Sequence, residues 1–421
     1  MKKILSLLLM LALLLSTTCA FAETSEEPYT ITYLASRGET SDKISVLMDI
    51  LALYQEEHPN FNIEVESVAD RTAYLQKVKI LASSNELPDW FDADPESFFA
   101  SLVDAGYIAD MEAVYDEIGV ADKFFNISKE YARLPDGRLN LFTWECNAEY
   151  FFYNKEIFKA AGIEQLPATM DELIEDCEKI VAIGKSPFAM GDSWPKYRYF
   201  AMVPFRMAGN DYIEQASRGE ISWGNEVGIE GAKWMQKLAS YFQEGWTTAD
   251  YDTMVNLFLS GECAMLYNGT WMVSDVVDEN MNLLDQYGVF GIPSFREDDK
   301  TNAADYFANS GIGTAVLASS MDDQMKDFLK FFFEHYPDLL ISKYNSLPSI
   351  MPSNMEALPD IYQKIMNDAA AVNTYAKCWD VVIDQASLQT LNSATVDLCL
   401  GAITPEEWGA EMDQAVADNL Q

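Results

Sequence analysis

The sequence predicts an α/β protein folded in two lobes. Segments that alternate like strands are each followed by a segment with apolar residues at helical spacing, which is the pattern of parallel βαβ units. The chain of 421 residues is longer than one hydrophobic core normally organises. Its composition also shifts near residues 134–158, where an extended stretch passes into a mostly helical region.

The first part of the chain contains three strand–helix repeats. The strand YTITYLAS precedes a helix over 43–58, and FNIEVESV precedes a helix over 73–84. The short strand in LPDWFDADP precedes a helix over 96–106. Because ligands meet parallel sheets at the carboxyl ends of the strands, the loops ASRGETSD and DADPES are expected to face a ligand.

Helices predominate from residue 155 to residue 285. One of them, over 169–184, begins with Thr169 as its N-cap and has an acidic first turn. Strands return in VFGIPSF and SGIGTAVLASS, and a helix over 321–336 follows. The last break, SLPSIMPS, precedes a helical tail.

The N-terminal segment predicts export. Lys2 and Lys3 precede the apolar run ILSLLLMLALLL, and Ala20–Ala22 gives a signal-peptidase pattern, so residues 1–22 are expected to be a signal peptide. The alternative is lipoprotein processing at Cys19, although Thr18 stands where a smaller residue is preferred. The later sequence has no apolar run long enough to span a membrane, so a soluble periplasmic or extracellular protein is expected.

The charge of the chain excludes two classes of partner. The formal net charge is −39, whereas nucleic-acid binding and adhesion to anionic lipid both need a basic face. The hydrophobic content of 49% is ample for a globular core. The acidity is most simply explained by solubility.

Histidines and cysteines are few. His58 and His335 are both interpreted as structural, so neither a histidine metal site nor a Ser-His-Asp triad is expected. No cofactor and no metal are expected. Five dispersed cysteines follow the predicted cleavage site, and buried free thiols are favoured for most of them, with one disulfide left open and its partners undetermined. They are Cys146, Cys177, Cys263, Cys378 and Cys399.

Several stretches together resemble the extracellular solute-binding proteins of ABC importers, family 1. FFYNKEIFKAAGIEQLPATMDEL and FLSGECAMLYNGTWM match two family patterns, and ELPDW matches a third in the N-terminal lobe. GVFGIPSF with NSGIGTAVLASS resembles the strand pair that recrosses between lobes, and LGAITPEEWGAEMDQA resembles the C-terminal helix. Their order and spacing extend over nearly the whole chain.

The resemblance implies the type II periplasmic-binding-protein-like fold, in which a multi-strand hinge joins two α/β lobes around a ligand cleft. It places one lobe at residues 28–142 plus 296–349 and the other at 143–295 plus 350–421. The chain then crosses between lobes near 143, 295 and 350. The resemblance also implies a monomer that carries a carbohydrate to the permease subunits of an ABC importer.

Aromatic side chains are the first candidates for contact with a sugar, because a flat ring can stack on the C–H face of a pyranose. Trp271 follows Asn268-Gly269, where the family has a stacking tryptophan, and the glycine is expected to let the backbone turn the indole toward the cleft. Trp194 lies in the loop MGDSWPKYRY, with Tyr197 and Tyr199 as substitutes. Trp144 is expected either to face the cleft or to fill the hinge, and Trp379 in KCWDVV is a third candidate.

Polar side chains on the strand–helix loops are the second group. A carboxylate that accepts two hydroxyl hydrogen bonds suits a sugar, although each of these groups could equally be a solvated loop residue. DADPE also suggests calcium ligands but lacks the glycine and the distal glutamate of an EF-hand. The polar candidates are Arg37, Glu39, Asp92, Asp94, Glu96, Glu145 and Asn147.

The leading functional hypothesis is a carrier for a mono- or oligosaccharide. The same fold could hold a peptide or a polyamine, and the acidic loops suit a cation. A phosphorylated metabolite is disfavoured, because it prefers a basic, glycine-rich pocket. The remaining alternative is a secreted glycoside hydrolase, which needs two carboxylates at a fixed separation. No specific pair stands out in the sequence, so the chain is not expected to be an enzyme.

Overall fold

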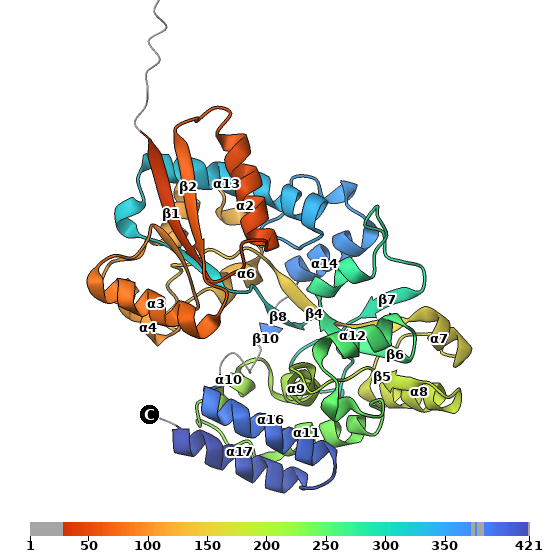
Figure 1. Cartoon of the computed structure of the whole chain (residues 1–421). Coiled ribbons are helices and arrows are strands. Elements are labelled where there is room, and N and C mark those ends of the chain that lie inside the picture. The colour runs from red at the N-terminus through yellow and green to blue at the C-terminus, as the bar shows by residue number, and fades with distance from the viewer. Residues whose placement is uncertain (1–27, 303, 372–374, 377–382, 420–421) are drawn as a thin grey trace, which may run out of the picture.

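The computed structural model describes residues 28–302, 304–371, 375–376 and 383–419. Its strands form one sheet of four strands and one of six, and helices cover both. Figure 1 shows two bodies that meet beside strand β4 (Asn147–Asn154). We call the body around the four-stranded sheet the N-terminal lobe and the other the C-terminal lobe. The prediction of a two-lobed α/β fold is confirmed.

The N-terminal sheet is mostly parallel, as the predicted βαβ repeats require. Its order is β2-β1-β3-β9, with β1 parallel to β2 and β3, and with β9 antiparallel to β3. The carboxyl ends of the three parallel strands therefore lie at one edge. The strands are β1 (Tyr29–Ala35), β2 (Phe61–Ser67), β3 (Trp90–Ala93) and β9 (Gly313–Val316).

Three helices of this lobe, α2, α3 and α5, illustrate side-chain caps that the sequence supplies. Ser41, Asp70 and Asp110 each accept a hydrogen bond from the backbone N–H three residues later, which satisfies one of the free donors of the first turn. The helices are α2 (Asp42–Tyr54), α3 (Arg71–Ser84), α4 (Ser97–Asp104), α5 (Met111–Ile118), η1 (Ala121–Lys123), α6 (Asn126–Tyr131), η4 (Ala318–Ser320) and α13 (Asp323–Tyr344).

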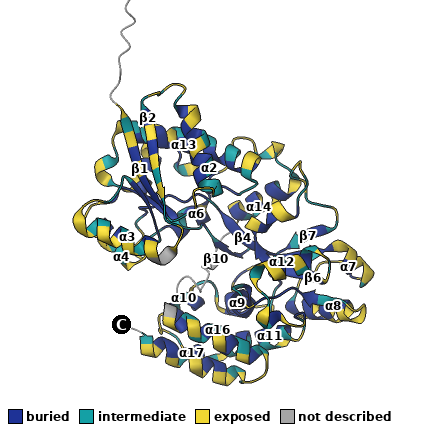
Figure 2. Cartoon of the chain, viewed as in Figure 1, coloured by how far each residue is buried: buried dark blue, intermediate teal, exposed yellow. Residues whose placement is uncertain are grey.

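The C-terminal sheet has a hydrophobic core on each face. Along β4, Phe151 packs into one core while Tyr150 and Phe152 pack into the other, as the alternation of strand side chains dictates. Figure 2 shows β4 dark blue and the outer faces of the surrounding helices yellow. The sheet order is β10-β8-β4-β6-β5, and β7 also pairs with β4. The further strands are β5 (Ser186–Phe188), β6 (Cys263–Gly269), β7 (Tyr287–Phe290), β8 (Tyr306–Asn309) and β10 (Tyr375–Ala376).

Helices surround this second sheet. Thr169 caps its helix as predicted and forms a capping box with Glu172. The helices are α7 (Lys155–Ala160), α8 (Met170–Ala182), α9 (Pro195–Ala208), α10 (Asp211–Ser217), α11 (Glu226–Ala239), η2 (Trp246–Thr248), α12 (Tyr251–Leu259), η3 (Thr270–Asp275), η5 (Met355–Ala357), α14 (Asp360–Ala371), α16 (Gln385–Cys399) and α17 (Pro405–Asn419).

The strand pairing moves one predicted lobe boundary. The predicted second segment of the N-terminal lobe begins at residue 296, but β8 pairs with β4 in the six-stranded sheet. The next strand, β9, pairs with β3 in the four-stranded sheet. The chain therefore crosses between the sheets at residues 310–312. An earlier passage lies between Phe142, which bridges to Thr314 of β9, and Asn147, which pairs with Asn309 of β8.

Some sequence predictions fall outside the described residues. These are the signal peptide with Cys19, and Trp379 with Cys378. Within the ranges that the structure describes, no helix has the length and apolar character needed to cross a bilayer. Cys146, Cys177 and Cys263 are buried free thiols, and Cys399 is a free thiol that is partly buried.

Candidate ligand-binding site

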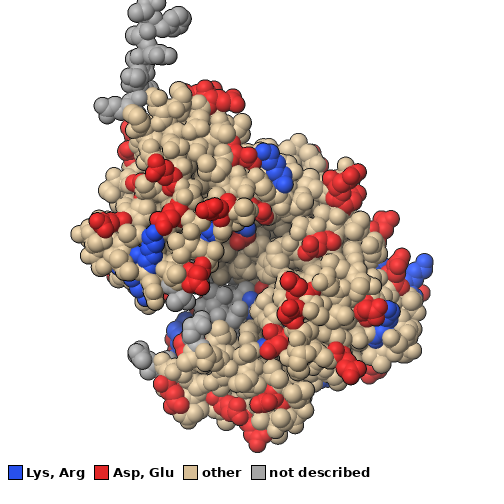
Figure 3. Space-filling model, viewed as in Figure 1, with Lys and Arg blue, Asp and Glu red and all other residues tan. Residues whose placement is uncertain are grey.

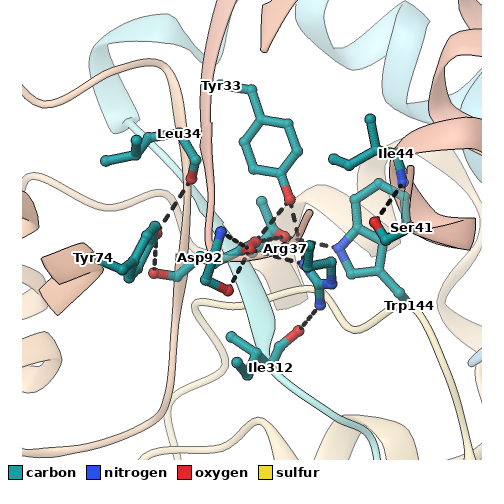
Figure 4. Close-up of polar contacts among 11 residues, drawn as sticks. Tyr33, Leu34, Arg37, Ser41, Ile44, Tyr74, Asp92, Trp144 and Ile312 are labelled. Atoms are coloured by element: carbon teal, nitrogen blue, oxygen red, sulfur yellow. Dashed lines mark hydrogen bonds and ion pairs between the residues drawn. The ribbon is translucent and has the colours of Figure 1, made fainter. Parts of the chain in front are cut away.

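The loops at the carboxyl ends of β1 and β3 are held together by the carboxylate of Asp92. Asp92 is buried, and its two oxygens accept five hydrogen bonds at 2.7–2.9 Å. Figure 4 shows these contacts converging from several segments. Burial, followed by the nearby carboxylate, raises the pKa of Tyr33 well above its ordinary value, so its hydroxyl remains a donor. The donors are the Tyr33 hydroxyl, the Ser36 backbone N–H and hydroxyl, the Arg37 guanidinium and the Thr314 hydroxyl.

This arrangement changes the role expected for Asp92. A carboxylate with five protein donors has no capacity left to accept two sugar hydroxyls. Asp92 instead fixes Arg37, whose other guanidinium nitrogen donates to the carbonyl of Ile312 at 2.5 Å. The arginine side chain keeps 12% exposure. The hypothesis that Asp92 contacts a ligand is therefore replaced by a structural role.

The other predicted acidic residues of these loops differ in exposure. Asp94 is half-buried, and Glu39 and Glu96 are exposed. Glu96 stands at the N-cap of α4 without a side-chain capping bond. Ser67, at the end of β2, was not among the predicted site residues, and its hydroxyl oxygen is buried without a hydrogen-bond partner in the described structure. All four belong to the edge where ligands meet parallel sheets.

Trp144 does not face a cleft. It is fully buried in the core of the N-terminal lobe, and its indole N–H donates to Thr314 at 2.8 Å. The Arg37 guanidinium lies 5.7 Å from the centre of its ring. Of the two roles left open by the sequence, the structure thus supports packing beside the hinge, and the ligand-contact role is wrong for this conformation.

Glu145 and Asn147 belong to the segment that crosses between the sheets. Lys43, at the start of α2, forms an ion pair with Glu145 at 2.6 Å. Asn147 donates to Asn309 at 3.3 Å and accepts from the Thr270 hydroxyl at 3.0 Å. This chain of contacts connects the N-terminal lobe to the residue that precedes Trp271.

The ion pair predicts a pH dependence of stability. Burial opposes ionisation of Glu145, but Lys43 and then Arg37 outweigh it and leave its pKa below the ordinary value of 4.5. A lowered carboxyl pKa stabilises the fold above that ordinary value, and the contribution is lost as the pH falls through the folded-state pKa. We expect Lys43→Met to cost about 1 kcal/mol at neutral pH and less in acid. Urea unfolding at several pH values checks this, and a constant difference would contradict it.

Trp271 presents an indole that is fixed and yet accessible. Its side chain is 40% exposed, and its N–H donates to the Tyr251 hydroxyl at 3.0 Å. Tyr251 is held in turn by the buried side chain of Asn268, with contacts of 2.9 and 3.2 Å. An exposed aromatic face that costs little to order is well suited to stacking on a ligand.

Gly269 is required for a different reason from the one predicted. Its backbone has φ −87° and ψ 172°, an extended conformation that any residue adopts. A Cβ at this position would lie 2.1–2.5 Å from the six-membered ring of Trp271. The glycine therefore makes room for the indole instead of allowing a turn.

Gly269→Ala is therefore expected to displace the Trp271 ring and to weaken ligand binding about as much as loss of the ring itself. The added methyl group cannot be accommodated while the ring stays in place, because cores tolerate little overpacking. Isothermal titration calorimetry with a compound that binds the wild-type protein measures the loss of affinity. An affinity for Gly269→Ala equal to that of the wild type would contradict the packing argument.

Trp194 lies next to Trp271. The two rings are 5.6 Å apart at 66°, which is an edge-to-face contact. Trp194 precedes α9 and is partly exposed. Tyr197 and Tyr199 are buried, with Tyr197 donating to Asn392 at 3.1 Å, so neither presents an open ring as a substitute for Trp194.

The surface between the lobes is hollowed on the face shown in Figure 3. Basic and acidic side chains both lie around this hollow. In the part of the chain that the structure describes, no group of three or more histidine, cysteine and acidic side chains could hold a metal ion. The arrangement offers fixed aromatic faces on one lobe and polar loop groups on the other.

Comparison with known proteins identifies the family. The model for bacterial extracellular solute-binding proteins matches residues 37–335. An uncharacterised ABC transporter extracellular-binding protein of Pyrococcus horikoshii is 25% identical over 249 residues, which are 57% of this chain and 56% of that protein. The sn-glycerol-3-phosphate-binding periplasmic protein of Brucella abortus is 28% identical over 212 residues, which are 48% of this chain and 46% of that protein. This chain spans about half the length of these curated relatives.

Solved structures share the fold over nearly the whole chain. The bacterial solute receptor AcbH, described as having an exclusive preference for β-D-galactopyranose, superposes with a TM-score of 0.78 at 15% identity. The alignment covers 94% of this chain and all of that receptor. At such low identity the likeness shows the fold alone. The family match covers well over half of the sequence, and the chain belongs to the bacterial extracellular solute-binding proteins.

Proposed function

We propose that this protein binds an uncharged mono- or oligosaccharide between its lobes and delivers it to the permease subunits of an ABC importer. The observation that carries the proposal is the accessible indole of Trp271, held by Tyr251 and set edge-to-face against Trp194. The exported location and the monomeric state are part of the same proposal. A ligand that contacts both lobes would stabilise a closed form, which the permease then recognises.

The charges at the site favour a neutral ligand. Four cationic side chains lie at or beneath the site, and each is ion-paired with a carboxylate. A phosphate group needs unpaired positive charge, so these pairs disfavour glycerol phosphate, the ligand named for one relative. They equally disfavour a polyamine at these carboxylates. The pairs are Arg37–Asp92, Lys43–Glu145, Lys196–Asp192 and Arg198–Glu149.

The same pairs argue against glycoside hydrolysis. A hydrolase needs one carboxyl group with a raised pKa to protonate the leaving group. The carboxylates of Asp92, Glu145 and Glu149 are each held by a cation, and the pKa of Glu145 is lowered. Carboxyl groups in such surroundings are suited to holding structure together and not to donating a proton.

A thermal-shift screen tests the proposal. D-Galactose, raffinose and chito-oligosaccharides are compared with glycerol 3-phosphate and spermidine at matched ionic strength, because a ligand that binds only the folded form raises the melting temperature. We expect at least one neutral sugar to stabilise the protein and the charged compounds to have no effect. A micromolar dissociation constant would correspond to a binding free energy of about −8 kcal/mol. Stabilisation by glycerol 3-phosphate or spermidine alone would refute the assignment.

Salt dependence provides an independent measurement. Binding of a neutral sugar is expected to be insensitive to added salt, whereas binding of a charged ligand weakens as salt screens the attraction. Chromogenic glycosides test the hydrolase alternative, and turnover of any of them by the wild-type protein would favour an enzyme.

A further inference from the structure

A buried ion pair lies beneath the two tryptophans of the proposed site. Glu149 has no exposed surface, and Arg198 is 4% exposed. The Nε atom of Arg198 lies 3.0 Å from both carboxylate oxygens of Glu149. Glu149 interrupts the apolar strand β4, while Arg198 comes from α9. The pair therefore joins the central strand of the C-terminal sheet to the helix that begins after Trp194.

Each member of the pair is connected to one tryptophan. Glu149 is directly opposite Gly269 in the β4–β6 ladder, and the Trp271 ring packs against Gly269. Arg198 is one helical turn beyond Trp194, and its guanidinium lies 5.1 Å from the centre of that ring. The ion pair thus connects Gly269, against which the Trp271 indole packs, to the face of the Trp194 indole.

We propose that the Glu149–Arg198 pair is a positioning element that sets the angle between the Trp194 and Trp271 indoles. The importance of that angle for a ligand rests on the proposed function, but the positioning itself does not. The planar guanidinium can face the indole and bind the carboxylate at the same time, which a lysine cannot do.

Energetics support a role in geometry more than in stability. Bringing two charges into the protein interior costs about as much as their attraction returns, and well-packed apolar replacements are often no less stable. A buried pair at this position is therefore not required to hold the core together. An apolar pair would lack the directional hydrogen bonds by which the ion pair orients both side chains.

The test uses the ultraviolet circular dichroism of the ligand-free protein. Two indoles in contact at an oblique angle couple their transitions, and the resulting couplet changes with the angle between them. Trp271→Phe defines the couplet of this pair by difference, because a second tryptophan pair, Trp223–Trp408, contributes its own signal. The double variant Glu149→Gln/Arg198→Met removes both charges together and so avoids leaving one buried charge uncompensated.

We expect the double variant to fold and to lose or change the Trp194–Trp271 couplet. Lys233→Met/Glu230→Gln, which removes an exposed pair of the same lobe, should leave the couplet unchanged. If the double variant does not fold, Arg198→Lys decides, because it keeps the charge but not the planar group facing Trp194. An unchanged couplet in the folded variant would overturn the proposal.

Binding separates this inference from the proposed function. With D-galactose or whichever sugar stabilises the wild type as the probe, the double variant should lose affinity, but less than Trp271→Ala. If no sugar binds the wild type, the proposed function fails while the couplet still reports on positioning. If the couplet is unchanged and the affinity is intact, the positioning role fails and the function stands.

Discussion

Trp271→Ala is expected to weaken sugar binding about tenfold or more and to leave the fold intact. A tenfold loss corresponds to about 1.4 kcal/mol, which one aromatic stacking contact can supply. The cost to folding is small because the ring is 40% exposed and its one hydrogen bond is to Tyr251 near the surface. Calorimetry measures the affinity, and thermal unfolding without ligand measures the stability.

Tyr107→Ala is the matched control for Trp271→Ala. Tyr107 is also a large aromatic residue, with 44% exposure, but it lies in the N-terminal lobe beyond α4. Its removal should leave affinity unchanged. If Trp271→Ala binds the sugar as tightly as this control does, then the indole does not contact the ligand.

Asp92→Ala is expected to destabilise the protein by about 3–5 kcal/mol, because it leaves the Arg37 guanidinium without its carboxylate. It also removes the acceptor for buried hydroxyl donors of β1 and β9, namely Tyr33 and Thr314. Each unpaired buried donor adds its own desolvation cost. Asp92→Asn should lose less, because the amide oxygen still accepts.

Urea unfolding followed by circular dichroism measures this loss. Asp49→Ala serves as the comparison, because Asp49 also binds a cation and a tyrosine hydroxyl, at 2.8 and 2.9 Å, but near the surface. We expect that variant to lose less than about 1 kcal/mol. Similar losses for the two variants would mean that Asp92 does not hold the loops together as its five contacts suggest.

Local sequence patterns predicted the fold because they repeat along contiguous segments. Alternating apolar residues in β1 and the helical spacing of α2 were both readable without tertiary information. The crossing predicted near residue 295 was misplaced, because β8 lies between the predicted strands VFGIPSF and SGIGTAVLASS and was not itself predicted. The pairing of β8 with β4 joins segments that are far apart in the sequence, so local patterns do not predict it.

The exposure of a candidate site residue was predictable only where its neighbours in the sequence determine its surroundings. The position of Trp271 shortly after Gly269 correctly suggested an accessible ring, although the backbone at the glycine is extended and not turned. Trp144 has polar neighbours in sequence, yet it is buried by aromatic residues of α13. The Glu149–Arg198 pair joins positions 49 residues apart. A charge within the apolar strand NAEYFFYN was the one available signal for it.

The return of the chain to the N-terminal sheet has a consequence for how the protein is made. Strand β9 covers one edge of β3 but is encoded some 220 residues later, after most of the C-terminal sheet. Until that late segment arrives, β3 has an open edge that can pair with another molecule. A nascent or truncated chain that ends before residue 313 is thus exposed to aggregation, and assembly of the first half must wait for the second.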